Sequence, residues 1–262
     1  MLSYIIICLV AVIVSALTLF SGFGLGTVLM PAFVLFFPLP VAIAATAVVH
    51  LANNIFKAVL VGKKADWHVV LRFAIPGAAA AMIGAWLLNI LSNIPAVFTY
   101  STGSYKHEVD IIKLVIGPLI ILFAFLDLLP RLQKLSFDRK YLPLGGAISG
   151  FFGGLSGNQG VLRSAFLIKS GLDKDAFIGT GTVSAVIVDI ARLLVYGISF
   201  YTLKFTTISK DMYGLIGAAI IAAFAGSFIG VRLVKKVTLR AIQIIVGVML
   251  VIVGFGMASG LI

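Results

Sequence analysis

The sequence has few charged residues, and acidic ones are the scarcest. Only 11% of its 262 residues are Asp, Glu, Lys or Arg, and 61% are hydrophobic, whereas about a quarter of the residues of a soluble domain are charged. A membrane span needs about 20 apolar residues, so the chain has room for roughly eight to ten helical pieces and for no soluble domain. The composition therefore predicts an all-α polytopic membrane protein, with one membrane domain over residues 1–262.

Cysteine and enzyme motifs are also scarce. Cys8 is the only cysteine, which excludes an internal disulfide and a cysteine-based metal cluster. We find no nucleotide-binding loop, no HExxH and no GxSxG, so we predict no enzyme, no cofactor and no metal. The first 20 residues lack the basic region and the small-residue cleavage site of a secretory signal, and we expect them to form a retained first span.

Basic residues outnumber acidic ones, 20 to 9, which gives a formal net charge of +11. Most of them lie in short loops between apolar runs, and such loops normally face the cytoplasm. We therefore assign the charge to membrane topology and anionic lipid, and we expect no nucleic-acid partner. The loops around Lys63, Lys134 and Lys235 would be cytoplasmic in a multi-pass inner-membrane protein with both termini outside.

The apolar runs fall into two similar halves, repeat 1 at residues 1–130 and repeat 2 at 144–262, joined by a basic linker at 131–143. Each half has four to five helical pieces and opens with a glycine-broken helix. The expected pieces are 4–20, 27–37, 41–61, 73–91 and 111–129, then 144–155, 161–170, 175–196, 212–231 and 241–258. The connections at 62–72, 92–108 and 197–211 are expected to be loops.

The two halves place their basic loops differently. In repeat 1 the basic loop follows the span with polar residues, whereas in repeat 2 the basic loop, 232–240, comes one connection later. If basic loops lie inside, equivalent loops lie on opposite sides, and the repeats have inverted topology. Each half then crosses the membrane an odd number of times, and the glycine-broken segment is either a re-entrant hairpin or a short crossing. Equivalent residues align at offsets of 133 to 135, as in Ser21/Ser156, Val28/Val161, Thr46/Thr180, Asn54/Asp189 and Lys57/Arg192.

A polar, glycine-rich stretch, SGNQGVLRSAF at 156–166, interrupts the start of repeat 2. Irregular backbone at membrane depth is tolerated only where protein or water surrounds it, and an arginine inside a span costs about 2.5–3.5 kcal/mol. We therefore expect Arg163 to contact an anion; the alternative is an arginine that extends to the interface. A helix that starts after Gln159 would add free N–H groups and a positive dipole end. The predicted substrate-binding residues are Asn158, Gln159, Gly160, Arg163 and Ser164, with Gly24, Gly26, Thr27, Asn54 and Lys57 from repeat 1.

Asp189 and Arg192 are three residues apart, so they share one helix face and can pair. A structural pair is the first interpretation, and proton coupling through Asp189 is the alternative. Lys57 has the same spacing from Asn54 and has no carboxylate within four residues in the sequence, which suits an anionic solute or a partner from the other repeat. His50 is interpreted first as a packing or hydrogen-bonding residue and second as a proton relay. Thr180, Thr182 and Ser184 are interpreted as ordinary hydrogen-bonding helix residues.

Several of these segments resemble a known family. GFGLGTVLMPAF (22–33), the Ala45-Thr46 pair and FIGTGT (177–182) resemble the TauE/SafE family of sulfite and organosulfonate exporters, over essentially the whole chain. The second break departs from the family pattern, which often has three glycines and a proline there; SGNQG with Ser164 is similar to a branch with NQGxLRSAF and VDxxR. The resemblance implies an inner-membrane exporter of small sulfur-containing anions such as sulfite, driven by an ion gradient.

Other functions fit the same residues. The site suits sulfate, thiosulfate or a small carboxylate as well as sulfite, and an anion channel is a different class that concentrative transport would exclude. A membrane-embedded enzyme is disfavoured by the missing motifs, and a carrier of cations by the Lys and Arg residues near the breaks. The predicted partners are a small anion, the lipid bilayer and a coupling proton or sodium ion, with a homodimer left open.

Overall fold

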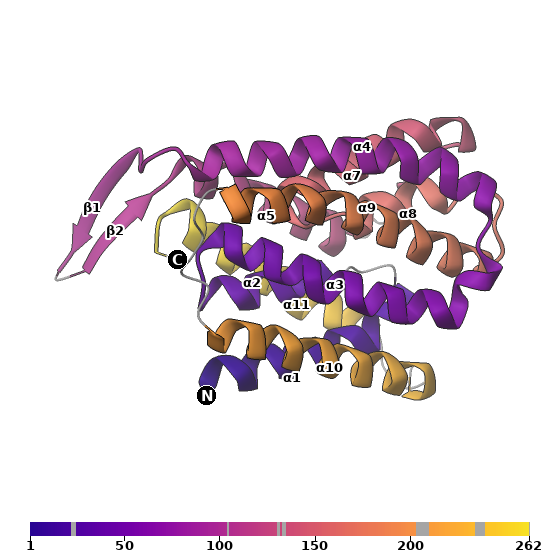
Figure 1. The fold of residues 1–262 in the computed structure, drawn as a ribbon, viewed down its shortest axis with the longest axis horizontal. Helices are drawn as coiled ribbons and strands as arrows, with labels where there is room; N and C mark the ends of the chain where they lie inside the picture. Colours follow the sequence, from indigo (N-terminus) through magenta and orange to yellow (C-terminus); the bar gives the residue numbers. More distant parts are fainter. Residues whose placement is uncertain are drawn as a thin grey trace.

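We analysed a computed structural model of the chain. It describes residues 1–21, 25–103, 105–129, 132, 135–202, 210–233 and 239–261. Within these residues the chain is helical apart from one β-hairpin (Figure 1). The first half contains α1 (Leu2–Ser21), α2 (Leu25–Val34), α3 (Leu39–Val61), the 3-10 helix η1 (Gly62–Lys64), α4 (Trp67–Ser92), β1 (Phe98–Thr102), β2 (Tyr105–Val109) and α5 (Ile111–Leu128). The second half contains η2 (Arg139–Tyr141), α7 (Leu142–Ser156), α8 (Gly160–Leu167), α9 (Lys174–Thr202), α10 (Lys210–Leu233) and α11 (Leu239–Ala258).

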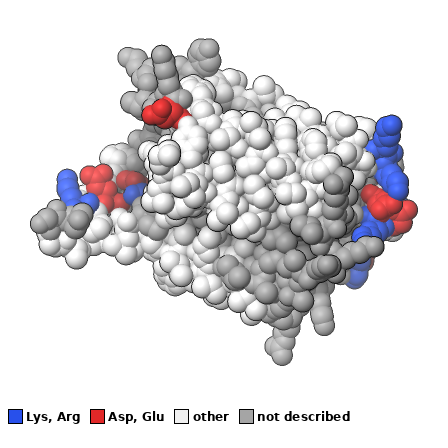
Figure 2. Space-filling model, turned by 90° about the horizontal axis from the view of Figure 1, so that it is seen from below, with Lys and Arg blue, Asp and Glu red and all other residues white. Residues whose placement is uncertain are grey.

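Length and hydropathy make this a membrane fold. Four stretches are long and apolar enough to cross a bilayer, namely Leu39–Lys64, Trp67–Ser92, Lys174–Ile198 and Asp211–Gly230, and a span needs about 20 such residues. On the face seen in Figure 2, charged side chains gather toward the two ends of the molecule and uncharged ones cover the band between them. The prediction of a polytopic helical membrane protein is confirmed.

Three connections differ from the loops that we expected. α4 begins inside the predicted loop at 62–72, because the Asp66 side chain caps it by accepting a hydrogen bond from the Val69 N–H at 3.1 Å. The segment 92–108 contains most of the β-hairpin, which the Tyr100 hydroxyl holds to the carbonyl oxygen of Ser259 at 2.7 Å. α9 continues to Thr202, inside the predicted loop at 197–211. The hairpin is thus an addition to a fold that is otherwise helical.

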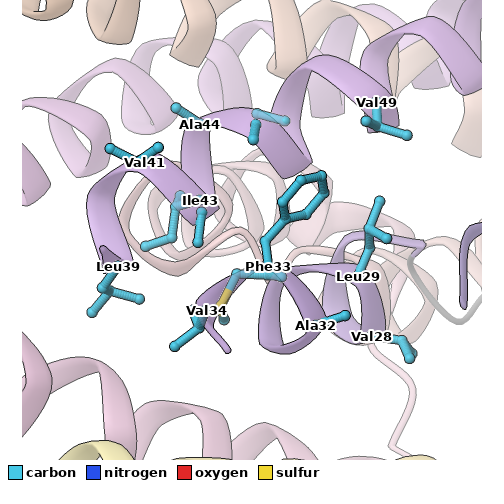
Figure 3. Close-up of a cluster of buried hydrophobic side chains, with 14 of the residues drawn as sticks. Val28, Leu29, Ala32, Phe33, Val34, Leu39, Val41, Ile43, Ala44 and Val49 are labelled. Carbon is cyan, nitrogen blue, oxygen red and sulfur yellow. The ribbon is translucent and has the colours of Figure 1, made fainter. Parts of the chain in front are cut away.

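In the first half, the short helix that follows the break, α2, folds back on α3 (Figure 3). α2 lies antiparallel to α3, with Val34 near Leu39 at one end of the pair and Leu29 near Val49 at the other (Figure 3). All ten residues of α2 are buried. Because a helix buried on every side must be apolar all round, the uninterrupted apolar sequence of α2 suits its place in the core.

The second half opens with a helical hairpin formed by α7 and α8, with the break between them. Its helices are antiparallel, since Phe166 packs on Gly145 at one end and Gln159 packs beside Gly153 at the other. The segment before α7 secures this hairpin: the Phe137 ring stacks on Phe166 with centroids 4.3 Å apart, and the Phe137 N–H donates to the Ala165 carbonyl at 3.1 Å. Both ends of the α7–α8 hairpin therefore lie on the side of the molecule where α7 begins.

Helices of one half pack against helices of the other in matching pairs. The first helix of each half runs parallel to the fourth helix of the other half. Between α7 and α4, Gly146 contacts Phe73 and Gly154 contacts Ala81. Between α10 and α1, Gly226 contacts Val12 and Gly230 contacts Ala16.

Helices at the same place in the order of the two halves run antiparallel to each other. Between α3 and α9, Asn54 contacts Asp189 and Val61 contacts Gly179. Between α5 and α11, Gly117 contacts Gly254 and Leu128 contacts Gly247.

Glycine allows the closest of these approaches. Gly146, Gly150 and Gly154 repeat every four residues along α7 and line the face that touches α4. A Cβ built on Gly150 would lie 1.9 Å from the carbonyl oxygen of Gly77, and one on Gly146 would lie 1.9 Å from that of Phe73. Small residues at such an interface let two membrane helices pack backbone to backbone. The glycine row therefore allows α7 to pack directly on α4.

Candidate functional site

The two breaks meet inside the molecule. α7 ends at Gly157, whose φ of +80° lies in the left-handed region that glycine tolerates best, and its N–H donates to the Gly153 carbonyl at 3.1 Å. A Cβ built on Gly26 would lie 3.1 Å from the carbonyl oxygen of Gly157. The second residue of α2 therefore touches the end of α7, and the two short helices, α2 and α8, both begin at this point. The N–H groups of a first helical turn have no partner within the helix and favour an anion.

Asp189 of α9 is the most heavily bonded group at this junction. It is fully buried. Its Oδ1 accepts from Nε and Nη2 of Arg192 at 3.0 and 2.7 Å and from Nε2 of Gln159 at 3.0 Å. Its Oδ2 lies 2.6 Å from Nδ1 of His50 and accepts from Nδ2 of Asn54 at 3.1 Å. One carboxylate thus joins α3 of the first half to the α7–α8 break and to α9.

Arg192 connects the same carboxylate to the end of α7. Its side chain is fully buried, and Nη1 donates to the carbonyl oxygen of Gly153 at 2.8 Å. One turn further along α9, the Tyr196 hydroxyl donates to the carbonyl oxygen of Gly154. The last carbonyls of a helix lack partners within the helix, so these two side chains from α9 complete the hydrogen bonding of α7 where it breaks.

Arg163 lies on the other side of the junction, on α8. A Cβ built on Gly181 of α9 would be 3.7 Å from Nε of Arg163, which places the guanidinium beside α9 about 12 Å along that helix from Asp189. Its Nη1 atom is buried and has no hydrogen-bond partner among the described residues. Lys57 of α3 is also buried, and its charge interacts with that of Arg163.

Asn158 is the buried amide of the break itself. The side chain is 2% exposed, and neither its oxygen nor its nitrogen has a hydrogen-bond partner in the part of the chain that the structure describes. The Thr46 hydroxyl on α3, which is close to Gly26, is in the same state. A buried amide or hydroxyl without a partner costs about 1–3 kcal/mol, so these atoms are suited to bonding something that enters the junction.

The predicted site residues therefore fall into two groups. Gln159 and Asn54, expected to contact substrate, bond to Asp189 together with Arg192, whereas Arg163, Asn158 and Lys57 carry polar groups outside that cluster. Of the remaining predicted residues, Gly26, Thr27 and Gly160 lie buried in the first turns of α2 and α8, Ser164 is half-buried on α8, and Gly24 lies outside the described residues.

Sequence reasoning missed some members of the site and placed others differently. Tyr196 could have been found, because it follows Asp189 and Arg192 on one face of α9 at the spacing i, i+3, i+7. Ser149, whose hydroxyl donates to the carbonyl oxygen of Gln159 at 3.0 Å, had no comparable signal. Thr180 accepts from the Asp66 N–H at 2.9 Å, which secures the start of α4 rather than the site. The buried Ser184 hydroxyl has no partner among the described residues.

The chemistry of these side chains suits the binding of an anion. Among the described residues there is no group of three His, Cys, Asp or Glu side chains that could hold a metal ion. The carboxylate of Asp189 is fully engaged. The buried atoms at the junction that lack a partner among the described residues are those of the Asn158 amide, the Thr46 hydroxyl and Nη1 of Arg163, which suit an anion.

Comparison with known proteins agrees with this description. A search of individual curated proteins gives no match. The sequence model of one protein family, described as sulfite exporter TauE/SafE, matches residues 7–257, which is nearly the whole chain. This is a family of membrane transporters rather than enzymes, and it is the family that the glycine-rich segments resemble. The protein belongs to the TauE/SafE family of sulfite exporters.

Proposed function

We propose that the protein is a secondary transporter that exports small sulfur-containing anions, such as sulfite or an organosulfonate, and binds them where its two broken helices meet. The observation that carries this proposal is the pair of unsatisfied buried groups at the start of α8, the Asn158 amide and Nη1 of Arg163. Arg163 has only donors to offer and Asn158 offers two more. An oxyanion, which supplies acceptors, matches them.

The setting of these groups strengthens the assignment. α2 and α8 both begin at the junction, so two positive helix ends converge on it. Anion sites of secondary transporters are commonly built from such half-helices near the membrane midplane. Lys57 adds positive charge, while Asp189 is neutralised by Arg192 and acts as a structural tie for the site.

We further propose that residues 1–130 and 144–262 are inverted repeats joined by a linker at 131–143. The directions of the helices support this, because first and fourth helices pair in parallel across the halves and corresponding helices pair antiparallel. With inversion, the two broken helices, α1–α2 and α7–α8, would be re-entrant elements that enter from opposite sides, with their breaks next to Gly26 and at Gly157. A substrate between them is then reachable from either side when one repeat moves against the other.

The arrangement of charge gives an orientation. The exposed basic residues at the end where α3 finishes and α9 begins are Lys63, Lys64, Arg72, Arg139, Lys140, Lys169 and Lys174. Both chain termini and the β-hairpin lie at the opposite end (Figure 1). Since basic loops normally face the cytoplasm, we propose that the termini and the hairpin are outside the inner membrane.

The first test is binding of sulfite, sulfate, thiosulfate and acetate to the purified protein, by calorimetry and thermal shift, with the Arg163→Ala variant alongside. We expect selective stabilisation by a sulfur oxyanion that Arg163→Ala weakens 10- to 100-fold, because a hydrogen bond to a charged group contributes about 1.5–3 kcal/mol. Arg72→Ala, which removes an exposed arginine of α4, is the matched control and should bind as the wild type does. Equal binding by both variants would remove Arg163 from the site.

A channel for the same anions is the second candidate, and the pair of unsatisfied donors does not distinguish it from a transporter. Proteoliposomes do. A transporter driven by a proton or sodium gradient accumulates the anion above its external concentration, whereas a channel only lets the anion equilibrate with the membrane potential. Failure to accumulate under an imposed proton or sodium gradient, with rapid equilibration, would favour the channel.

A further inference from the structure

His50, interpreted first as a packing or hydrogen-bonding residue and second as a proton relay, bonds to the central carboxylate of the junction. The ring is 3% exposed on α3, and its Nδ1 atom lies 2.6 Å from Oδ2 of Asp189 on α9. The carboxylate can only accept, so Nδ1 carries the hydrogen and donates it. The remaining ring nitrogen, Nε2, is then left with its lone pair.

Asp189 itself has no room for a proton. Five N–H groups point at its two oxygens, two from Arg192 and one each from Gln159, Asn54 and His50. A carboxylate offers about four lone-pair directions, so a proton on either oxygen would have to displace one of these donors. Asp189 is therefore a fixed anion, and the alternative of proton coupling through its carboxyl group is not favoured by this geometry.

His50 has the capacity that Asp189 lacks. Among the described residues, the only polar side-chain atom close to its Nε2 is the Asn54 amide nitrogen, at 3.4 Å. That nitrogen lies nearer to Nδ1, at 3.0 Å, and donates to Asp189 at 3.1 Å, so it does not occupy the Nε2 lone pair. The adjacent ring carbon, Cδ2, lies 3.7 Å from a Cβ built on Gly26. This edge of the ring thus faces the start of α2, where the two breaks meet.

On this basis we propose that Nε2 of His50 is the binding site for a coupling proton, which is taken up together with the transported anion. The inference rests on the proposed anion site. A proton from water would add to the lone pair of Nε2, and no bond of the protein would break. The imidazolium would keep its Nδ1–H on Asp189 and present a second N–H toward the junction.

The surrounding charges explain why proton and anion would bind together. Asp189 favours an imidazolium at His50, whereas the positive charges of Arg192 on α9 and Arg163 on α8 oppose it. Lys57, two turns further along α3, carries charge of the same sign. α2 and α7, which also border the junction, contain no titratable side chain in their described residues. On α10, which packs against α3 through Ser227 and Asn53 at 2.7 Å, the charged residues lie only in the terminal turns.

An anion at the junction would offset the opposing cations. It would therefore favour protonation of His50, and by linkage a proton on His50 would favour the anion to the same degree. Anion affinity should rise as the pH falls, by at most about tenfold per pH unit for one linked proton. If one proton accompanies each anion, the net negative charge moved in each transport event is smaller by one elementary charge.

The direct test leaves the site intact. The chain has three histidines, and His68 and His107 lie away from the junction, so the double variant His68→Gln/His107→Gln keeps His50 as the sole histidine. With labelled histidine, NMR follows its protonation against pH, with and without saturating methanesulfonate or sulfite. We expect the pH of half-protonation to rise by about one unit with the anion, which corresponds to tenfold tighter anion binding by the protonated form.

A second measurement separates this inference from the proposed function. Calorimetry in two buffers of different ionisation enthalpy gives the protons taken up per anion bound, for the wild type and for His50→Gln. The difference between the two proteins cancels the ionisation of the anion itself and should approach one proton. Anion binding with no difference, or with an unchanged NMR titration, would overturn the role of His50 and leave the proposed function standing. No binding of any anion by the wild type would overturn the proposed function first, and this inference with it.

Discussion

The two short helices that follow the breaks, α2 and α8, differ in their side chains and in their burial. α2 is buried at every position and carries one polar side chain, Thr27, whereas α8 has three buried residues out of eight and carries Arg163 and Ser164. α2 forms part of the hydrophobic core with α3 (Figure 3). α8 packs against α7 and the segment before it through Phe166, and its remaining side chains are half-buried. α2 thus forms part of the scaffold, whereas α8 carries the side chains that we propose contact the ligand.

The same division holds for the two polar spans. Asn54 on α3 and Asp189 on α9, which are equivalent in the repeats that we propose, touch each other. α9 contributes the charged pair, while α3 contributes the neutral groups that bond to it. A symmetric backbone with asymmetric chemistry can bind one anion in one orientation, which two identical halves would not specify.

The largest loss of stability is expected when Asp189, the charged member of the pair Asp189 and Asn54, is replaced. Asp189→Ala leaves Arg192 buried without its carboxylate, and removal of one partner of a buried ion pair costs about 3–5 kcal/mol. Asn54→Ala, at the equivalent position, removes one hydrogen bond to the same charge and should cost about 1.5–3 kcal/mol. Chemical unfolding in detergent micelles measures both variants. Equal losses in the free energy of unfolding would mean that Asn54 and Asp189 contribute equally to stability, contrary to the difference between α3 and α9 described above.

A somewhat smaller loss of stability is expected from the glycines at the α7–α4 and α10–α1 interfaces. Gly150→Ala would place a Cβ 1.9 Å from the Gly77 carbonyl oxygen, and Gly226→Ala would place one 2.2 Å from that of Val12. Each change forces the two parallel helices apart, at a cost of about 1–3 kcal/mol or more. Gly197→Ala is the matched control, because nothing lies within 4 Å of a Cβ at that helical position. Melting temperatures should fall for the first two variants only. A fall in only one of them would show that the α7–α4 and α10–α1 interfaces are not equivalent.

Much of this fold could be predicted from the sequence, because the signals are local. Hydrophobic length gives the helices, glycines at 157 and 160 mark the second break, and the i, i+3 spacing gives the pair of Asp189 and Arg192. The bond between His50 and Asp189 joins residues 139 positions apart, so only the antiparallel packing of α3 on α9 brings it about. The β-hairpin was missed because its residues are polar, and polarity alone indicates a loop.

The two neighbouring amides of the break should separate binding from stability. Asn158 has no partner among the described residues, whereas Gln159 donates to Asp189. Asn158→Ala should therefore weaken anion binding by about 10- to 100-fold with no loss of stability, since a lost hydrogen bond to a charged group is worth about 1.5–3 kcal/mol. Gln159→Ala should lower the free energy of unfolding by a similar amount. Calorimetric titration with the anion, paired with thermal melting, distinguishes the two, and identical profiles would mean that both amides serve one role.

The smallest effect on stability is expected at the basic end, where Lys64 after α3 pairs with Asp175 at the start of α9. Both side chains are exposed, with relative accessibilities of 63% and 57%, and exposed pairs contribute little because water and salt screen them. Lys64→Ala should therefore leave the melting temperature unchanged.

The pair of Lys64 and Asp175 nevertheless joins the first half to the second on the side that we assign to the cytoplasm, so the two halves can separate there only if the pair breaks. Transport rates at low and high salt test this: if the pair restrains opening, Lys64→Ala transports faster than the wild type at low salt, and the charge-reversed double variant Lys64→Asp/Asp175→Lys restores the wild-type rate. If rates are equal at all salt concentrations, the contact between α3 and α9 is held by Asp189 and its buried partners alone.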